Sequence, residues 1–211
     1  DHLVDVSPRR PDLAGLDAPF VLCVGTPAVH KNLGPALAAL GAAGIPTIVV
    51  GARAGRVFAG AETGPSGPSG PGPITYAGRL TDEELAWLYG QAEALVFPSR
   101  YEGFGVPVVE AQRAGCPVVA TTAAAVPETS GEGAVLVDPD RPDEFVRAVR
   151  RLRSEPGLRE RLVAAGRANA ARFTWDAAAA ALTEVLADAL AADQPGPRPG
   201  DRPGDRPSRS A

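Results

Sequence analysis

Short apolar runs alternate with helical patterns along most of this chain. Six mainly apolar runs are typical of buried strands and lie at 20–24, 45–50, 74–77, 94–97, 117–120 and 134–137. Residues with helical spacing stand between several of these runs, and the chain beyond residue 141 has a helical pattern throughout. Strands that are apolar on both faces and alternate with helices are typical of a parallel sheet. The pattern predicts an α/β fold: a Rossmann-like, doubly wound parallel sheet of about six strands with extra C-terminal helices.

Turn and capping residues set the limits of the predicted helices. Thr81, followed three residues later by Glu84, has the spacing of a capping box and predicts a helix start. Asn32 stands where its side chain can cap the helix that follows the first strand. The turn at 103–105 contains two glycines, and Pro107 just after it falls where a first helical turn tolerates proline. These signals predict where three helices begin.

The chain divides into three parts by composition. We expect residues 1–17 to be an interdomain linker segment, 18–191 to form one Rossmann-like domain, and 192–211 to be a disordered tail of Pro, Gly and Arg. A stretch rich in glycine and proline at 60–73 is expected to be a flexible surface loop for the same reason. The sequence contains no methionine, so we expect it to begin in the linker between two domains.

Composition excludes several classes of protein. Aromatic residues are 5% of the chain and hydrophobic residues 45%, so the core should be aliphatic and rich in alanine. A net charge of -4, with no basic stretch, argues against nucleic acid as the partner. No apolar run reaches the roughly 20 residues of a transmembrane span. Cys23 and Cys116 both lie in apolar runs, which does not suit a secreted disulfide scaffold.

The densest candidate chemistry follows the fourth strand. A glycine-rich turn that leads into a helix presents unpaired N–H groups, and these favour a phosphate or another anion. Glu102 precedes the turn and Glu110 lies about one helical turn into the helix. Carboxylates beside a phosphate are useful when they accept hydrogen bonds from hydroxyls, as sugars provide. The alternative is that Glu102 is a solvated loop residue and Glu110 only favours its helix.

A second candidate loop follows the first strand, in the segment VGTPAVHKNL at 24–33. Lys31 is the only lysine in the chain and stands where this loop meets a helix. Its ammonium could neutralise a diphosphate leaving group, although a solvated surface lysine is the plainer interpretation. His30 beside it is either a second donor to the same anion or a bystander on the surface.

Several motifs in order carry a resemblance to a known family. Glu102 and Glu110 enclose seven residues inside PSRYEGFGVPVVEAQRAGCPVVA. This segment stands in one order with VGTPAVHKNL, LTDEELAWLYGQAEALVFPS, AAVPETSGEGAVLVDPDRPDEF and RFTWD. The stretch 18–185 thereby resembles the carboxyl-terminal, nucleotide-sugar-binding domain of retaining glycosyltransferases with the GT-B fold (glycosyltransferase family 4, group 1).

The resemblance implies roles for individual residues. Glu110 would accept the ribose hydroxyls of the donor nucleotide, and Glu102 would hold hydroxyls of the transferred sugar. The loop at Arg79 and Leu80 would lie along the base. Glu102 and Lys31 would be the catalytic residues, with Lys31 stabilising the leaving diphosphate. The remaining donor-binding positions would meet the sugar or the diphosphate through side chains or backbone N–H groups: Thr26, His30, Gly103, Phe104, Gly105 and Val106. His30 departs from the family pattern, which has arginine there, and this weakens its assignment to the diphosphate.

The implied function is the donor-binding half of a retaining hexosyltransferase that uses a GDP- or UDP-sugar and needs no metal or other cofactor. The N-terminal acceptor domain would be missing from this chain, which should then be weakly active or inactive by itself. Because no signal-peptide pattern is seen, we expect a cytoplasmic protein, with any peripheral contact with the inner face of the membrane made by the missing half. Two alternatives stay open: a nucleotide-sugar epimerase of the GT-B type, and a non-catalytic module that binds nucleotide sugars.

Overall fold

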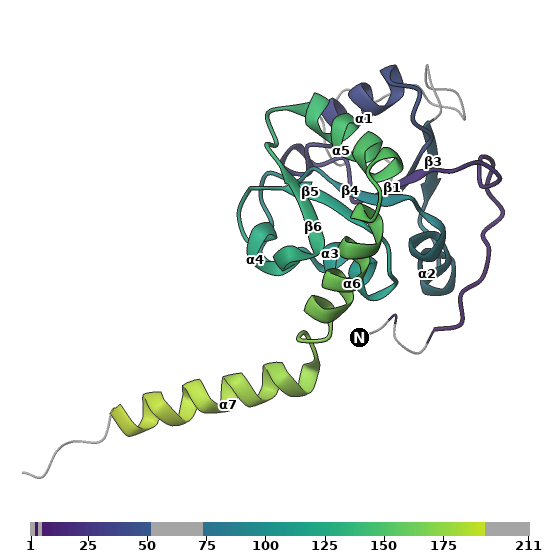
Figure 1. The fold of residues 1–211 in the computed structure, drawn as a ribbon. Coiled ribbons are helices and arrows are strands. Elements are labelled where there is room, and N and C mark those ends of the chain that lie inside the picture. Colours follow the sequence, from purple (N-terminus) through teal and green to yellow (C-terminus); the bar gives the residue numbers. More distant parts are fainter. Residues whose placement is uncertain (1–2, 4–5, 52–73, 193–211) are drawn as a thin grey trace, which may run out of the picture. The chain divides into compact units, whose positions relative to one another are not determined.

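A computed structural model describes residues 3, 6–51 and 74–192 (Figure 1). The chain divides into two units, one ending at Phe173 and one beginning at Thr174. The first unit holds the sheet, and the second contains helix α7 (Trp175–Ala192). The flexible loop predicted at 60–73 lies outside the described residues, as does the predicted tail from residue 193 on. The predicted domain limits therefore stay predictions.

Six strands form one parallel sheet, as the sequence predicts. They are β1 (Val21–Val24), β2 (Thr47–Val50), β3 (Ile74–Gly78), β4 (Ala94–Phe97), β5 (Val118–Thr121) and β6 (Ala134–Val137). The strand order across the sheet is β3-β2-β1-β4-β5-β6, and every neighbouring pair is parallel. The chain thus builds outward in one direction from β1 to β3 and in the other from β4 to β6. This is the order of a doubly wound Rossmann-like sheet, so the predicted fold class is confirmed.

The helices lie close to their predicted positions. The longer ones in the first unit are α1 (Leu33–Ala42), α2 (Asp82–Gln91), α3 (Val106–Arg113), α5 (Pro142–Ser154) and α6 (Leu158–Ala170). Short turns that the sequence pattern did not predict are the 3-10 turns η1 (Val29–Lys31) and η2 (Gly131–Gly133) and the helix α4 (Val126–Ser130). The capping box at the start of α2 is confirmed, because the Thr81 hydroxyl accepts from the Glu84 N–H and the Glu84 carboxylate accepts from the Thr81 N–H.

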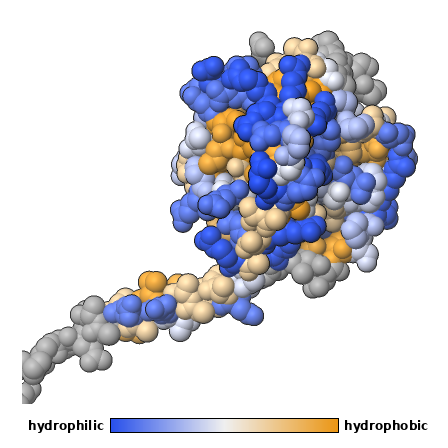
Figure 2. All heavy atoms as spheres, viewed as in Figure 1, coloured by the Kyte–Doolittle hydropathy of each residue, from blue (hydrophilic) through white to orange (hydrophobic). Residues whose placement is uncertain are grey.

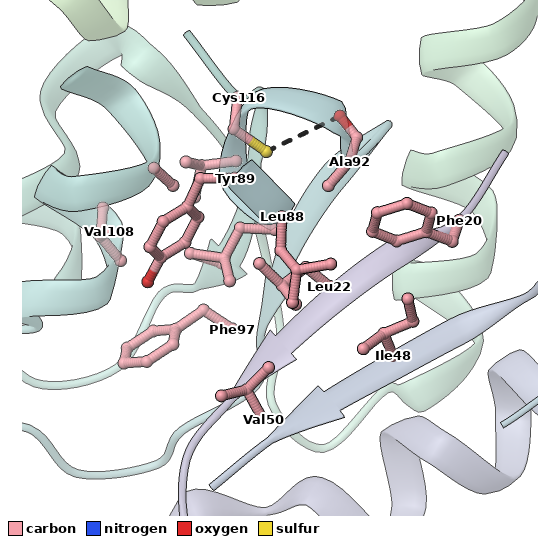
Figure 3. Close-up of a cluster of buried hydrophobic side chains, with 14 of the residues drawn as sticks. Phe20, Leu22, Ile48, Val50, Leu88, Tyr89, Ala92, Phe97, Val108 and Cys116 are labelled. Carbon is pink, nitrogen blue, oxygen red and sulfur yellow. Dashed lines mark hydrogen bonds between the residues drawn. The ribbon is translucent and has the colours of Figure 1, made fainter. Parts of the chain in front are cut away.

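Two apolar clusters lie on opposite faces of the sheet. Alternate strand residues such as Leu22 and Phe97 pack with Leu88 of α2 and Val108 of α3 (Figure 3). The residues between them, such as Val96, pack instead with side chains of α1 and α5. Both clusters consist mainly of Val, Leu and Ala, which confirms the predicted aliphatic core. Strands enclosed on both faces explain why the sequence shows continuous apolar runs instead of alternation.

The carboxyl ends of the strands meet at one edge of the sheet. The register pairs Val24 with Val50, and Val50 with Gly78, so these strands end level with one another. The loops after β1 and β2 also touch. A Cβ atom on Gly51 would lie 2.1 Å from the carbonyl oxygen of Gly25, so only glycine fits there. The edge therefore gathers the loops in which the sequence places its candidate chemistry.

The segment before β1 packs along α2. The backbone N–H of Arg9 donates to the carbonyl of Glu83, and the guanidinium of Arg10 lies over the ring of Trp87. Leu16 is buried in the cluster that contains Leu88, and Leu13 packs against the same cluster. The described part of the segment predicted as a linker thus contributes to the core of the first unit.

Surface character differs from one region to another. Figure 2 shows a mainly hydrophilic face on the first unit, and exposed arginines of α5 such as Arg147 and Arg151 form ion pairs within that helix or just after it. Taken by itself, α7 exposes large apolar side chains: Trp175, Leu182, Val185, Leu186 and Leu190. Over the described residues, no helix combines the length and the apolar character needed to cross a membrane.

Candidate functional site

The candidate site lies where the direction of chain building reverses in the sheet. β1 and β4 are neighbours in the sheet, but the chain leaves them toward opposite edges. The loops that follow them, at 25–32 and 98–105, therefore start side by side at the carboxyl edge of the sheet. In open parallel sheets this is the place where ligands bind. The two loops singled out from the sequence are thus brought together by the strand order.

An ion pair joins these two loops. The Lys31 ammonium donates to a carboxylate oxygen of Glu102 over 2.7 Å, although the two residues are 71 positions apart. Their side chains keep 22% and 12% of their surface exposed, so solvent or a ligand can still reach both. The sequence predicts both residues for the site, but it gives no indication that they contact each other. Without a ligand, the cation and the carboxylate neutralise each other.

Backbone and side-chain contacts hold the two loops in place. The Arg100 N–H donates to the carbonyl of His30 over 2.8 Å, and the Arg100 guanidinium pairs with Asp140 in the loop after β6. The amide nitrogen of Asn32 donates to the carbonyl of Pro139 over 2.9 Å. Loops after three strands are therefore tied to one another beside the Lys31–Glu102 pair.

The contact of Asn32 corrects one prediction. Asn32 occupies the N-cap position of α1, but its side chain makes no capping hydrogen bond. Its backbone is left-handed, with φ 51° and ψ 27°, because η1 leads directly into α1 at this residue. A capping side chain ordinarily belongs to a residue with extended backbone. The buried amide is instead used to hold the loop after β6.

The glycine turn leads into α3 as predicted. Gly105 is the N-cap residue with φ 96°, a left-handed conformation that suits glycine. Gly103 and Phe104 are exposed, as is Val106 at the first position of the helix. The Thr129 hydroxyl donates to the Phe104 carbonyl over 2.6 Å and so fixes the turn from α4. Gly105 itself is buried, so the turn exposes Gly103, Phe104 and Val106 at this edge of the sheet.

Glu110 lies on α3 and is held by a tyrosine from α2. The hydroxyl of Tyr89 donates to a carboxylate oxygen of Glu110 over 2.9 Å. Tyr89 is fully buried, whereas Glu110 is half-buried. Burial raises the pKa of Tyr89 well above its usual value, and the negative Glu110 raises it further. The phenol therefore stays protonated and acts as a donor to the carboxylate.

The other predicted donor-binding residues are distributed along the same edge. Thr26 and His30 are exposed in the loop after β1. Leu80 follows β3 and is partly buried against the cluster that contains Tyr89. β3 lies three strand spacings from β4, or roughly 14 Å at the usual spacing between strands. Leu80 thus belongs to the loop after β3, whereas Lys31 and Glu102 belong to the loops after β1 and β4.

The remaining ionisable groups add little chemistry. In the described parts of the chain, no three His, Cys, Asp or Glu side chains are grouped so that they could hold a metal ion. Cys23 and Cys116 are free and buried, and burial raises the pKa of each thiol to about 12. The Cys116 thiol donates weakly to the Ala92 carbonyl (Figure 3). Both cysteines therefore belong to the core.

Sequence reasoning did not identify Tyr89, Arg100 or Thr129 as parts of the site. Tyr89 reads as an apolar position of an amphipathic helix, and its hydroxyl was the only available signal, since a buried polar group needs a partner. Nothing in the sequence names that partner, because Glu110 lies 21 residues away on another helix. The contact of Thr129 likewise comes from α4, which the sequence pattern does not predict.

Comparison with known proteins connects this geometry to a family. Residues 71–169 match the sequence profile of the family described as "Glycosyl transferases group 1". The chain is 37% identical over 105 residues to O-antigen chain mannosyltransferase B of Escherichia coli, an alignment that covers 50% of this chain and 28% of that protein. It is 43% identical over 116 residues to an MMP alpha-(1->4)-mannosyltransferase of Mycolicibacterium hassiacum, covering 53% and 28%. The chain thus spans little more than a quarter of these relatives.

Solved structures show the same fold. Sucrose-phosphate synthase from Thermosynechococcus elongatus aligns with a TM-score of 0.65 and 25% identity, covering 84% of this chain and 47% of that one. The Anabaena protein HepE, solved in complex with UDP-glucose, aligns with a TM-score of 0.62 and 20% identity, covering 84% and 50%. Each match spans about half of the larger protein. From the family match and these relatives together, residues 71–169 are similar to the group 1 glycosyltransferases, and the chain shares the fold of the solved structures.

Proposed function

We propose that this chain binds the donor of a retaining hexosyltransferase, a nucleotide diphosphate sugar whose glycosyl group is transferred to an acceptor hydroxyl. One observation carries the proposal: the Lys31–Glu102 pair joins the loops after β1 and β4, beside the glycine turn at the start of α3. A cation and backbone N–H groups suit a diphosphate, and a carboxylate suits sugar hydroxyls. The family match over residues 71–169 and the UDP-glucose complex of the fold relative HepE support this choice.

Each site residue has a proposed role. Lys31 neutralises charge on the diphosphate, with Thr26 and His30 beside it in the same loop. The turn from Gly103 to Val106 directs N–H groups to the sugar and the diphosphate, aided by the positive end of the α3 dipole. Glu102 accepts hydroxyls of the transferred sugar, Glu110 accepts the ribose hydroxyls, and Leu80 lies along the base.

The chemical step needs no group beyond these residues and the two substrates. The acceptor oxygen forms a bond to the anomeric carbon on the face from which the diphosphate leaves. The bond between that carbon and the phosphate oxygen breaks, and its electron pair stays on the leaving diphosphate. The acceptor hydroxyl gives its proton to an oxygen of the same diphosphate. Lys31 and the N–H groups stabilise the charge that develops there, so we propose a reaction independent of metal ions.

Acceptor binding is assigned to a domain outside this chain. The chain spans little more than a quarter of the curated relatives and about half of the solved structures. A donor site at the open edge of one sheet is then completed by a second domain, and that domain makes any peripheral contact with a membrane. The free, buried thiols are consistent with a reducing compartment, so we propose a cytoplasmic enzyme.

Calorimetry tests the donor-binding function. The 211-residue chain is titrated with UDP, GDP and their sugar derivatives, and we expect binding of one nucleoside diphosphate in the millimolar range or tighter. Lys31→Ala should weaken that binding about tenfold, because it removes one charge-assisted contact with the diphosphate. Arg150→Ala, which removes an exposed cation from α5, is the matched control and should leave binding unchanged. If neither nucleotide binds, the proposed function is wrong.

Activity assays distinguish the two remaining reaction classes. Without the acceptor domain, the chain should turn over poorly in any transfer assay. A nucleotide-sugar epimerase would instead convert the sugar of the bound donor with no acceptor present. Chromatography of the nucleotide sugar after incubation with the chain separates these cases, and the appearance of an epimer would contradict the transferase proposal.

A further inference from the structure

A buried tyrosine makes direct contact with the carboxylate assigned to the ribose. Tyr89 has no exposed surface, and its hydroxyl donates to Glu110 over 2.9 Å. Figure 3 shows its ring beside Leu88 and Val108, with the hydroxyl oxygen lying between Val108 and Phe97 in this view. Glu110 is half-buried on α3, so one helix supplies a fixed donor to a carboxylate on another.

The ring of Tyr89 lies in a mainly apolar cluster. Most of its other members are aliphatic or phenyl side chains, with the thiol of Cys116 and the partly buried Trp87 beside them. The hydroxyl adds a polar atom to this apolar surrounding, and such an atom costs free energy unless it is paired. Its partner is Glu110 rather than a backbone group of its own helix. The hydroxyl therefore donates a hydrogen bond to the carboxylate, while the ring packs in the core.

We propose that Tyr89 is a positioning residue, which holds the Glu110 carboxylate in the orientation that receives the ribose hydroxyls of the donor. The proposal rests on the proposed function, because it takes Glu110 as the ribose-binding group. A carboxylate on a flexible two-carbon stem loses rotational freedom when it binds a diol. The bond from Tyr89 restricts that stem before the ligand arrives, so less freedom is lost on binding.

The anchor itself is rigid. Tyr89 lies near the end of α2, a helix whose start is fixed by the capping box at Thr81. Tyrosine has only two rotatable side-chain bonds, and both are fixed by the surrounding cluster. The phenol stays protonated because burial and the charge of Glu110 both raise the pKa of Tyr89. The donor thus keeps one position and one protonation state over the working pH range.

The test removes only the hydroxyl, with Tyr89→Phe, and compares two ligands. The first is whichever of UDP and GDP the unaltered chain binds; the second is the 2′,3′-dideoxy form of the same nucleotide. We expect Tyr89→Phe to weaken binding of the ribonucleotide by about three- to tenfold, the effect of one hydrogen bond. Binding of the dideoxy form should change by less than about twofold, since it offers Glu110 no hydroxyls. Tyr76→Phe, which removes a hydroxyl from β3, is the control and should affect neither ligand.

A second background separates positioning from general damage to the fold. In Glu110→Ala, the further change Tyr89→Phe should have no effect on ribonucleotide binding, because the group it positions is gone. An equal loss for both ligands, a loss that persists in Glu110→Ala, or no loss at all would overturn the proposal. Absence of nucleotide binding by the unaltered chain would instead reject the proposed function. If Tyr89→Phe does not fold, the proposal is overturned as well, since the hydroxyl would then be required by the core.

Discussion

Glu102→Gln should strengthen the binding of a nucleoside diphosphate. In the ligand-free protein, the Lys31 ammonium is occupied by Glu102 at 2.7 Å. A diphosphate has to displace Glu102 from the Lys31 ammonium, and it is also repelled by the negative charge of the Glu102 carboxylate. Glutamine keeps the shape of the side chain and loses the charge, so Lys31 becomes more available. Most substitutions at a binding site lower the affinity for the ligand, whereas this one should raise it.

The magnitude follows from the burial of the pair. An exposed ion pair contributes about 0.2–1 kcal/mol, and a well-formed hydrogen bond between charged groups about 1.5–3 kcal/mol. The Lys31 and Glu102 side chains keep 22% and 12% exposure, so solvent screening places the competition near ~1 kcal/mol. That free energy corresponds to about a fivefold lower Kd for the diphosphate. The intact nucleotide sugar should gain less, because Glu102 also accepts hydroxyls of the sugar.

Calorimetry with the diphosphate and with the nucleotide sugar measures both effects. The gain in diphosphate affinity should shrink at high salt. Salt screens the Glu102 charge in the unaltered protein, so removing that charge then changes less. Glu160→Gln, which removes an exposed carboxylate from α6, is the matched control. It should leave the Kd for the diphosphate unchanged. Unchanged or weaker binding of the diphosphate by Glu102→Gln would refute the competition between the carboxylate and the ligand for Lys31.

Three further predictions concern stability and reactivity. Gly133→Ala should lower the free energy of unfolding by about 1–3 kcal/mol in urea titrations, because its Cβ would lie 2.4 Å from the amide nitrogen of Gln112. Gly90→Ala should raise it by about 0.5–1 kcal/mol, since the new methyl meets nothing and favours α2. Cys23 and Cys116 should resist alkylation in the folded protein at mildly alkaline pH and react on unfolding, because burial raises the pKa of both thiols to about 12; fast labelling of the native state would contradict this.

The sequence determined the elements of the fold and the edge where the chemistry lies. Six buried apolar runs located the strands, and the capping pattern at Thr81 located the start of α2, because these signals are local in the chain. Glu102 and Lys31 could be assigned to one edge because parallel strands carry their following loops to the same side. Glu110 could be added because it lies about one turn into the helix after the glycine turn.

The tertiary structure decided which of these groups contact each other. Lys31 meets Glu102 only because β1 and β4 are neighbours, an order that no local pattern encodes. Tyr89 meets Glu110 because α2 and α3 pack on the same face of the sheet. Asn32 does not make the predicted capping hydrogen bond for a similar reason. Its backbone is left-handed, and its side-chain amide donates to the Pro139 carbonyl in the loop after β6. Side-chain partners far apart in sequence depend on how elements pack, and that packing is settled by the whole core rather than by any one segment.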